Sequence, residues 1–237
     1  PKHMKSVYDF LDNNPFHGFT VGIIDDVTHL SIPVDNNFHV TGNYTSCLFY
    51  GLGSDGTVSA NKSSIKIIGD ATHQYAQAYF AYDSRKAGGV TRSHLRFGKE
   101  PIRSTYYVEH ADFLSCSLDT YMFKFDMISC LKEGGTFLLN TDIPASEIAS
   151  RMPNRMKKQL AEKHAKFYII DANAIAAKIG LGRRTNTILQ ASFFYLNQNI
   201  MPYAEAQDWM KKFAKKAYGK KGDAIVQMNW DAIDAGA

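Results

Sequence analysis

The amino-acid sequence predicts an α/β fold: a doubly wound, Rossmann-like and mostly parallel sheet with helices on both faces and a helical C-terminal part. Two patterns support this fold class. Between residues 46 and 186, short apolar or aromatic runs typical of strands alternate with segments whose apolar residues recur at helical spacing. Residues 187–235 are mostly helical in pattern. A hydrophobic content of 45% in 237 residues is ample for a buried core.

Residues 1–44 are expected to form a lead-in arm. They combine an amphipathic start with an apolar run at residues 19–24, followed by the acidic turn Asp25-Asp26. No Pro/Gly/Ser-rich linker or internal repeat divides the rest of the chain. We therefore expect residues 45–237 to form a single α/β domain.

The domain is expected to open with a strand, a helix and a second strand, at residues 47–50, 54–68 and 75–82. Residues 84–98 are rich in glycine and arginine and show poor regular periodicity. We therefore expect a mobile cationic loop over residues 84–98.

The following segments continue the alternation. Strands are predicted at residues 104–108, 113–116, 136–139 and 166–170. Helices are predicted at residues 121–131, at residues 146–163 with a break at Pro153, and from residue 173 to residue 179. A turn at Glu133–Gly135 is expected to separate the first of these helices from the strand after it.

Charge and cysteine usage exclude several classes of protein. The net charge of +4 is mild, and the basic clusters at residues 151–167 and 211–221 are expected to be solvated helix faces. The three cysteines lie far apart without a CxxC pair, which indicates buried reduced thiols and no zinc or iron–sulfur site. No apolar stretch approaches the length of a membrane span, and no secretory signal is visible. We expect a cytoplasmic protein whose partners are neither nucleic acid nor membrane.

A glycine motif follows the first predicted strand of the domain. Residues 51–56 match the pattern G-x-G-x-x-G, and they lie between a predicted strand and a predicted helix. Glycines let the backbone approach a ligand closely, and free N–H groups at a helix start attract an anion. Ser54, Thr57, Asn61 and Lys62 add side-chain donors in the first turns of the same helix. The motif therefore predicts binding of a phosphate-type group.

Two alternatives remain open on the residues alone. The glycines can simply close a strand-to-helix turn, with Ser54 or Asp55 as its N-cap. A nicotinamide site needs an acidic residue after the second strand, and Asp83 is roughly in position though somewhat late, whereas Asp70 precedes that strand. The cations after Asp83, such as Arg85, weaken a site for NAD but suit the extra phosphate of NADP. The enzyme alternative is therefore an NADP-linked Rossmann oxidoreductase.

The cationic segment at residues 83–98 suits the capture of a polyanionic ligand or docking against another domain; the alternative is a solvated surface loop. An isolated His94 within it is expected to be structural. A further glycine cluster at residues 180–186 is expected to cap helices. Its polar residues are candidates for a partner surface: Arg183, Arg184 and Asn186.

Three strings, in this order, resemble the pyruvate:ferredoxin (flavodoxin) oxidoreductases. They are Leu48–Asp70 (LFYGLGSDGTVSANKSSIKIIGD), Tyr79–Tyr106 (YFAYDSRKAGGVTRSHLRFGKEPIRSTY) and Gly180–Asn186 (GLGRRTN). Val21–Pro33 is similar to the segment that leads into this domain in the family. The resemblance covers nearly the whole chain. It implies the central domain of those enzymes, equivalent to the gamma subunit of the multi-subunit 2-oxoacid:ferredoxin oxidoreductases.

The resemblance implies a share in an enzyme that converts pyruvate and coenzyme A to acetyl-CoA and carbon dioxide and passes electrons to ferredoxin or flavodoxin. This domain is then expected to contribute to the coenzyme A site and to contacts with other domains, with no catalytic residue and no metal ligand of its own. Thiamine diphosphate, magnesium and [4Fe-4S] clusters are expected only in other parts of the enzyme, because the chain has no convincing G-D-G with a following Asn and no cysteine array. The full enzyme is expected to be a homodimer, and the isolated chain inactive.

Residue by residue, the resemblance assigns coenzyme A binding to positions that match two of the strings. The glycine-loop string supplies Gly53, Ser54, Asp55, Gly56, Thr57, Asn61 and Lys62. The cationic string supplies Ser84, Lys86, Gly88, Gly89 and Arg96. A non-catalytic structural or interaction domain is the remaining alternative, and it is distinguished by the lack of any nucleotide binding.

Overall fold

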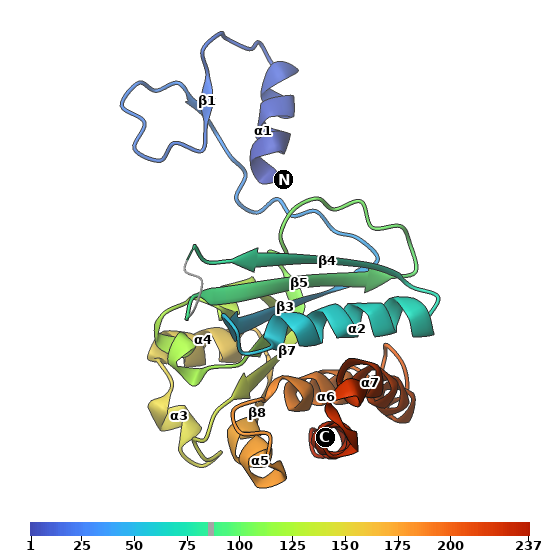
Figure 1. Cartoon of the computed structure of the whole chain (residues 1–237). Coiled ribbons are helices and arrows are strands. Elements are labelled where there is room, and N and C mark those ends of the chain that lie inside the picture. The colour runs from blue at the N-terminus through green and yellow to red at the C-terminus, as the bar shows by residue number, and fades with distance from the viewer. Residues whose placement is uncertain (85–87) are drawn as a thin grey trace. The chain divides into compact units, whose positions relative to one another are not determined.

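The computed structural model describes residues 1–84 and 88–237, and it divides into two units, residues 1–43 and residues 44–237 (Figure 1). The first unit contains helix α1 (Lys2–Leu11) and two short parallel strands, β1 (Thr20–Val21) and β2 (Ser31–Ile32). Contacts of the Phe10 ring with the rings of Phe16 and Phe19 pack the end of α1 against the segment that leads to β1.

The second unit is built on a six-stranded sheet of order β4-β5-β3-β6-β7-β8. Its strands are β3 (Tyr44–Leu52), β4 (Tyr75–Tyr82), β5 (Val90–Gly98), β6 (Ala111–Cys116), β7 (Leu131–Asn140) and β8 (Lys166–Ile170). Strands β3, β6, β7 and β8 pair in parallel, whereas β5 is antiparallel to both β3 and β4. All strands except β5 therefore share one direction, and the predicted mostly parallel α/β sheet is confirmed.

Helices cover both faces of the sheet (Figure 1). One face carries α2 (Thr57–Ala71), α5 (Ala172–Ile179), α6 (Asn186–Leu196), α7 (Tyr203–Tyr218), the 3-10 helix η3 (Gly219–Lys221) and α8 (Asp223–Asp234). The other carries the 3-10 helices η1 (Asp119–Phe123) and η2 (Ile128–Cys130), then α3 (Ile148–Arg151) and α4 (Asn154–Glu162). The gap between α3 and α4 confirms the predicted break at Pro153.

Each face has its own apolar core, and β3 contributes to both. Because side chains alternate along a strand, Cys47 and Phe49 enter the core beneath α2, whereas Leu48 and Tyr50 enter the core beneath α4. Burial on both faces explains why β3 is a continuous apolar run in the sequence. This position in the centre of the sheet fixes the glycine motif that follows β3.

The expectation of a loop at residues 84–98 is wrong for residues 90–98, which form β5 inside the sheet. Leu95 and Phe97 point into the core beneath α2. The alternate residues His94 and Arg96 are also buried, on the opposite face of β5. Polar residues at interior positions hid this strand from a search for apolar alternation.

The strand expected at residues 104–108 is absent, since this segment runs irregularly beside β5. Its backbone bonds to side chains instead of to a strand: the N–H of Val108 donates to His94 Nδ1 at 3.1 Å, and the carbonyl of Tyr107 accepts from Arg96 at 2.9 Å. The aromatic and polar residues that suggested a strand thus cover the polar face of β5.

The helix expected at residues 121–131 is also wrong. The segment forms η1 and η2, and β7 already begins at Leu131. Gly134 lies inside β7 with φ 67°, at an irregularity in the pairing with β6, rather than in a turn before the strand. A glycine with positive φ inside a strand is typical of a bulge.

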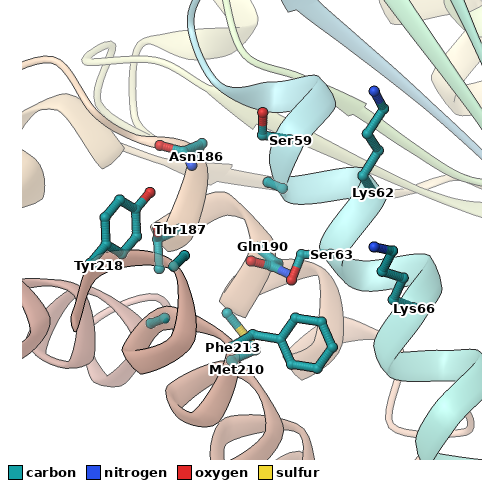
Figure 2. Close-up of a pocket in the computed structure, with 13 residues that line it drawn as sticks. Ser59, Lys62, Ser63, Lys66, Asn186, Thr187, Gln190, Met210, Phe213 and Tyr218 are labelled. Carbon is teal, nitrogen blue, oxygen red and sulfur yellow. The ribbon is translucent and has the colours of Figure 1, made fainter. Parts of the chain in front are cut away.

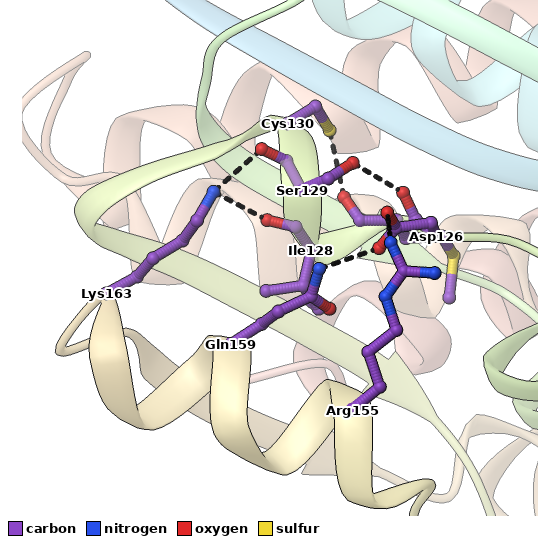
Figure 3. Close-up of polar contacts among 8 residues, drawn as sticks. Asp126, Ile128, Ser129, Cys130, Arg155, Gln159 and Lys163 are labelled. Carbon is purple, nitrogen blue, oxygen red and sulfur yellow. Dashed lines mark hydrogen bonds and ion pairs between the residues drawn. The ribbon is translucent and has the colours of Figure 1, made fainter.

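A polar cluster joins the end of α4 to η2 (Figure 3). Lys163, directly after α4, donates to three backbone carbonyls, those of Ile128, Ser129 and Leu131. From the same helix, Arg155 and Gln159 both contact the carboxylate of Asp126. These contacts fix α4 against the segment that enters β7.

Candidate functional site

The glycine motif lies at the carboxyl end of β3 and leads directly into α2. The chain leaves β3 toward α2 on one face of the sheet, while the neighbouring parallel strand β6 leads into η1 on the other face. Such a reversal of the connections opens a crevice at the strand ends, which is where open α/β sheets bind ligands. We call residues 51–57 the glycine loop.

Asp55 holds the glycine loop in shape. Its carboxylate accepts hydrogen bonds from the backbone N–H groups of Leu52 (2.8 Å) and Thr57 (2.7 Å), from the Thr57 hydroxyl (2.9 Å) and from the Ser117 hydroxyl (2.9 Å). Ser117 directly follows β6, so this carboxylate ties the ends of two neighbouring strands to the start of α2. The Asp55 side chain therefore positions the loop.

The three glycines of the loop leave little or no room for a side chain, and a Cβ on Gly51 would lie 2.6 Å from Cβ of Thr57. A Cβ on Gly56, whose φ is 90°, would lie 2.9 Å from Cγ of Asn186. A Cβ on Gly53 would lie 3.3 Å from the carbonyl oxygen of Gly89, which accepts a 2.8 Å hydrogen bond from the Gly53 N–H. Ser54 has a φ of 76° and an exposed side chain. The loop thus turns tightly between α6 and the start of β5.

A hollow of about 320 Å³ opens over the glycine loop. Four of the predicted ligand-binding residues in the loop line it, together with the start of β5 and the segment after β4: Gly53, Ser54, Asp55, Gly56, Gly89 and Asp83. Ser84 is exposed beside Asp83 and donates to its carboxylate at 3.3 Å, and Gly88 is exposed with φ 74°. Lys86 lies outside the described residues.

A second hollow of about 260 Å³ lies between α2, α6 and α7, and Ser59 borders both hollows (Figure 2). Lys62 and Lys66 lie one turn apart on its α2 side, while Met210 and Phe213 form part of its apolar wall. The Lys62 ammonium also lies 5.3 Å from the centre of the Phe80 ring on β4. The structure therefore places Lys62 along the flank of α2 and not over the glycine loop.

Thr57 and Asn61 are buried, with exposed fractions of 8% and 4%. Asn61 Nδ2 has no hydrogen-bond partner among the described residues. A cavity of about 20 Å³ borders both residues together with Ser115 and Asn186, and that is enough space for one water molecule. The structure places these two residues beneath the loop, so direct contact with a ligand stays a prediction.

Arg96 is not brought to the glycine loop. It lies near the far end of β5, where it pairs with Ser46 and Gln77, seven residues beyond Gly89. At about 3.3 Å per residue, this separation is roughly 23 Å along the strand. The sequence string that contains both ends of β5 therefore spans two different regions of the domain.

The start of α6 is a contribution that the sequence interpretation missed. Asn186, its first residue, lies against Gly56, so the N-termini of α6 and α2 converge beside the glycine loop. Neither helix has a side-chain cap at its N-cap residue, and Arg183 and Arg184 are exposed just before α6. The sequence feature that could have pointed to α6 is the glycine cluster at residues 180–186, which directly precedes this helix. The predicted capping role of this cluster is confirmed for Gly180, which ends α5 with a φ of 90°.

Burial shifts the pKa values of two thiols and one imidazole in the domain. Burial raises the pKa of Cys116 to about 12 and that of Cys130 to about 11. Burial also lowers the pKa of His94 to about 4, so its imidazole is neutral at pH 7, in agreement with a structural role. Among the described residues, no cluster of His, Cys, Asp and Glu could hold a metal ion, and no helix has the length and apolar character needed to cross a membrane.

Known proteins resemble this chain in sequence. The family model described as pyruvate ferredoxin/flavodoxin oxidoreductase matches residues 46–237. The chain is 51% identical over 239 residues to a pyruvate-flavodoxin oxidoreductase of Enterobacter agglomerans and 50% identical over 236 residues to a pyruvate:ferredoxin oxidoreductase of Moorella thermoacetica. These matches cover 100% and 99% of this chain but 20% of each relative. The chain thus spans about a fifth of the length of the curated relatives it matches.

Solved structures share the fold. The PORC subunit of the Thermotoga maritima pyruvate oxidoreductase matches with a TM-score of 0.65 at 20% identity, over 82% of this chain and 96% of that one. A 2-oxoglutarate:ferredoxin oxidoreductase from Magnetococcus marinus, with 2-oxoglutarate, coenzyme A and succinyl-CoA bound, matches with a TM-score of 0.63 at 18% identity, over 83% of this chain and 31% of that one. Identities this low establish the likeness of the fold alone.

Proposed function

Because the chain belongs to the pyruvate ferredoxin/flavodoxin oxidoreductase family, we propose that it is the coenzyme A-binding domain of a larger enzyme that converts pyruvate and coenzyme A to acetyl-CoA and carbon dioxide. Electrons pass to ferredoxin or flavodoxin through groups held in other parts of that enzyme. The domain itself binds and orients coenzyme A so that the thiol meets the reacting group, which is a positioning role.

One observation carries this proposal: the N-termini of α2 and α6 converge on a glycine loop at the crevice of the sheet. The start of α2 borders the hollow over the loop, and the start of α6 borders the hollow beside it. The partial positive charge of these helix starts suits the phosphates of coenzyme A, although the Asp55 carboxylate offsets part of it at α2. The four hydrogen bonds to Asp55 hold the loop in one conformation, so little ordering is needed when a ligand binds. The predicted roles of Gly53, Ser54 and Gly56 are retained on this basis.

The flank of α2 extends the proposed site. Lys62 and Lys66 follow the loop at one-turn spacing, and Ser59 joins the hollow over the loop to the hollow beside these lysines. A long ligand that carries phosphates near one end can therefore lie along α2, with Lys62 as a point charge on phosphate. Gly89 faces the loop, and Ser84 and Gly88 lie near it in the chain, so these three residues are retained in the proposal. Lys86 is retained from the family resemblance alone. Arg96 is omitted because of its distance from the loop.

A specific observation favours the rival assignment to an NADP-linked oxidoreductase: Asp83 lines the hollow over the glycine loop. The sheet argues against it. In a dinucleotide fold, the strand beside the first strand runs parallel and carries this acidic residue at its end. Here the reversed β5 occupies that position, and β4, which precedes Asp83, is one strand further away.

We further propose that the domain assembles with other domains of the same enzyme, and that the enzyme is a cytoplasmic homodimer. Thiamine diphosphate, magnesium and [4Fe-4S] clusters are assigned to those other domains. Support comes from the fivefold greater length of the relatives and from the deeply buried Cys47 and Cys116, which cannot reach a cluster without disrupting the core. On this proposal, the isolated chain has no oxidoreductase activity.

Calorimetric titration of coenzyme A into the chain tests the proposal. Binding is expected to weaken as salt increases, and Lys62→Ala is expected to weaken it roughly tenfold, because a charge-assisted contact to phosphate is lost. Lys158→Ala is a matched control, since it removes an exposed lysine from α4 on the other face of the sheet. Tight binding of NADPH in place of coenzyme A would establish the rival enzyme. Binding of neither nucleotide would indicate a structural or interaction domain.

A further inference from the structure

A cavity of about 450 Å³ lies at the far end of β5, away from the glycine loop. Its walls come from β4, β5 and the irregular segment at residues 104–109, and they include Gln77, Tyr79, Arg96, Tyr106 and Tyr107. The exposed Glu109 is the acidic residue among those that line it. The volume is in the range of small-molecule pockets. None of these residues contributes to the site proposed for coenzyme A.

Arg96 is a buried cation without a charged partner in this cavity. Its side chain is 4% exposed, and it forms no ion pair with the residues that the structure describes. Nη1 donates to Gln77 Oε1 at 3.1 Å and Nη2 donates to the Tyr107 carbonyl at 2.9 Å, whereas Nε has no partner among the described residues. A guanidinium stays charged at any physiological pH, so an anion would relieve a large part of its burial cost.

Surrounding groups fix the guanidinium in place. The centres of the Tyr106 and Tyr44 rings lie 5.0 and 5.8 Å from its Cζ atom. Gln77 is held in turn by a 2.6 Å hydrogen bond from its Nε2 to the Ser104 carbonyl. The Ser104 hydroxyl contacts the hydroxyls of Tyr44 (3.0 Å) and Tyr106 (3.2 Å). The guanidinium is therefore held in one orientation at the wall of the cavity, while its buried Nε–H is unsatisfied.

His94 adds a second donor without an acceptor on the same face of β5. Its Nδ1 accepts a hydrogen bond from the Val108 N–H, so the neutral ring carries its proton on Nε2. That Nε2 is buried and has no partner among the described residues. The imidazole stacks on the Tyr107 ring at 4.7 Å, next to the wall of the cavity. His94 is not among the residues that line the cavity, so the feature that favours an anionic ligand over a cationic one is the unpaired charge of Arg96.

We propose that this cavity binds a small-molecule carboxylate with a flat, apolar body, and that the guanidinium of Arg96 pairs with the carboxylate. The planar guanidinium matches a carboxylate in shape and charge. The half-exposed rings of Tyr79 and Tyr107, which meet edge to face at 5.2 Å, provide the apolar surface for the body of the ligand. The site is independent of the coenzyme A proposal, because it is at the opposite end of β5.

Titration of benzoate into the ¹⁵N-labelled chain, followed by NMR, tests the proposal. The Nε–H signal of Arg96 is expected to shift in a saturable manner with benzoate, and neutral benzamide is expected to leave it unchanged. Arg96→Lys keeps the charge but removes the planar guanidinium, so benzoate binding should weaken about tenfold. Arg92→Lys is the matched control, since Arg92 is exposed on the same strand, and it should leave the affinity unchanged.

A second variant tests the site even if Arg96→Lys, a substitution at a buried residue, unfolds the chain. Tyr79→Leu at the half-exposed rim should weaken benzoate binding roughly threefold and leave the weaker binding of acetate unaffected, because acetate has no flat body to contact the ring. The proposal is overturned if millimolar benzoate causes no saturable shift of the Arg96 signal, or if benzamide shifts it equally. If acetate binds as tightly as benzoate, the proposed contact with a flat, apolar ligand body is refuted.

Discussion

Replacement of Lys163 by Met tests how strongly one polar cluster stabilises the domain. Lys163 joins the end of α4 to η2 through the carbonyls of Ile128 and Ser129 (Figure 3). It also donates to the carbonyl of Leu131, the first residue of β7. Methionine keeps a comparable unbranched stem but removes the charge and all three donors. The substitution therefore probes these hydrogen bonds with little change in packing.

The structure sets the size of the effect. A hydrogen bond to a charged group contributes about 1.5–3 kcal/mol. Two of the three bonds are partly buried and the third is exposed, so water replaces much of what is lost. With about 1 kcal/mol for each partly buried bond and little for the exposed one, the free energy of unfolding should fall by about 2 kcal/mol. For a chain of this size, Tm should then fall by roughly 4–8 °C.

Urea unfolding followed by far-UV circular dichroism measures this difference. Lys158→Met is the matched control, because it removes the same charge from α4, five residues before Lys163, and breaks only an exposed 3.7 Å ion pair with Glu162. Its effect should stay below about 0.5 kcal/mol. If Lys163→Met destabilises the chain no more than Lys158→Met, the reasoning about this cluster is refuted.

Three further expectations concern the glycine loop, the thiols and His94. Gly56→Ala places a Cβ at positive φ and 2.9 Å from Asn186, so it should lower the free energy of unfolding by roughly 2 kcal/mol. Adding Asn186→Ala to the same chain should recover part of this loss. If a denaturant titration shows no recovery, the contact between the two residues is contradicted. With pKa values of about 11 and 12, Cys130 and Cys116 should react with iodoacetamide at pH 8 far more slowly in the native chain than in urea, and Cys130 should react first. Burial lowers the pKa of His94 to about 4, below its value in the unfolded chain, so between pH 6.5 and pH 4 the unfolded state binds a proton that the folded state does not. The free energy of unfolding should therefore decrease as the pH is lowered from 6.5 to 4. His94→Phe should reduce this pH dependence, and an unchanged slope would show that His94 does not cause it.

The fold class could be predicted from the sequence because the central strands β3 and β6 and the second half of β7 are apolar and buried on both faces. Strand β4 at Tyr75–Tyr82 and strand β8 at Lys166–Ile170 have the predicted bounds, and the glycine loop lies between a strand and a helix as predicted. Pro153 marked the break between α3 and α4 because proline cannot continue a helix. These features depend on local patterns, which a sequence contains in full.

The errors arose where distant residues determine the local structure. Strand β5 carries His94 and Arg96 at interior positions, and only the partners at residues 104–108 make their burial tolerable. Because the backbone of residues 104–108 bonds to these two side chains, the segment does not form the strand predicted for it. At the site, Asn186 is 130 residues from Gly56 in sequence, so no local pattern could place it against the loop. The proposed ligand contacts of the loop follow from family resemblance and stay predictions.

The reversed position of β5 has a consequence for the order in which the chain folds. Tyr82 of β4 pairs with Thr91 of β5, nine residues later in the sequence, whereas Leu52 of β3 pairs with Val90 of β5, which is 38 residues later. Closing the shorter loop loses less chain entropy, so the β4–β5 hairpin is expected to form before β5 reaches β3. Until the hairpin docks, the central strand of the sheet keeps an open edge. Transient mispairing during synthesis is therefore expected at β3, which is the strand that carries the glycine loop.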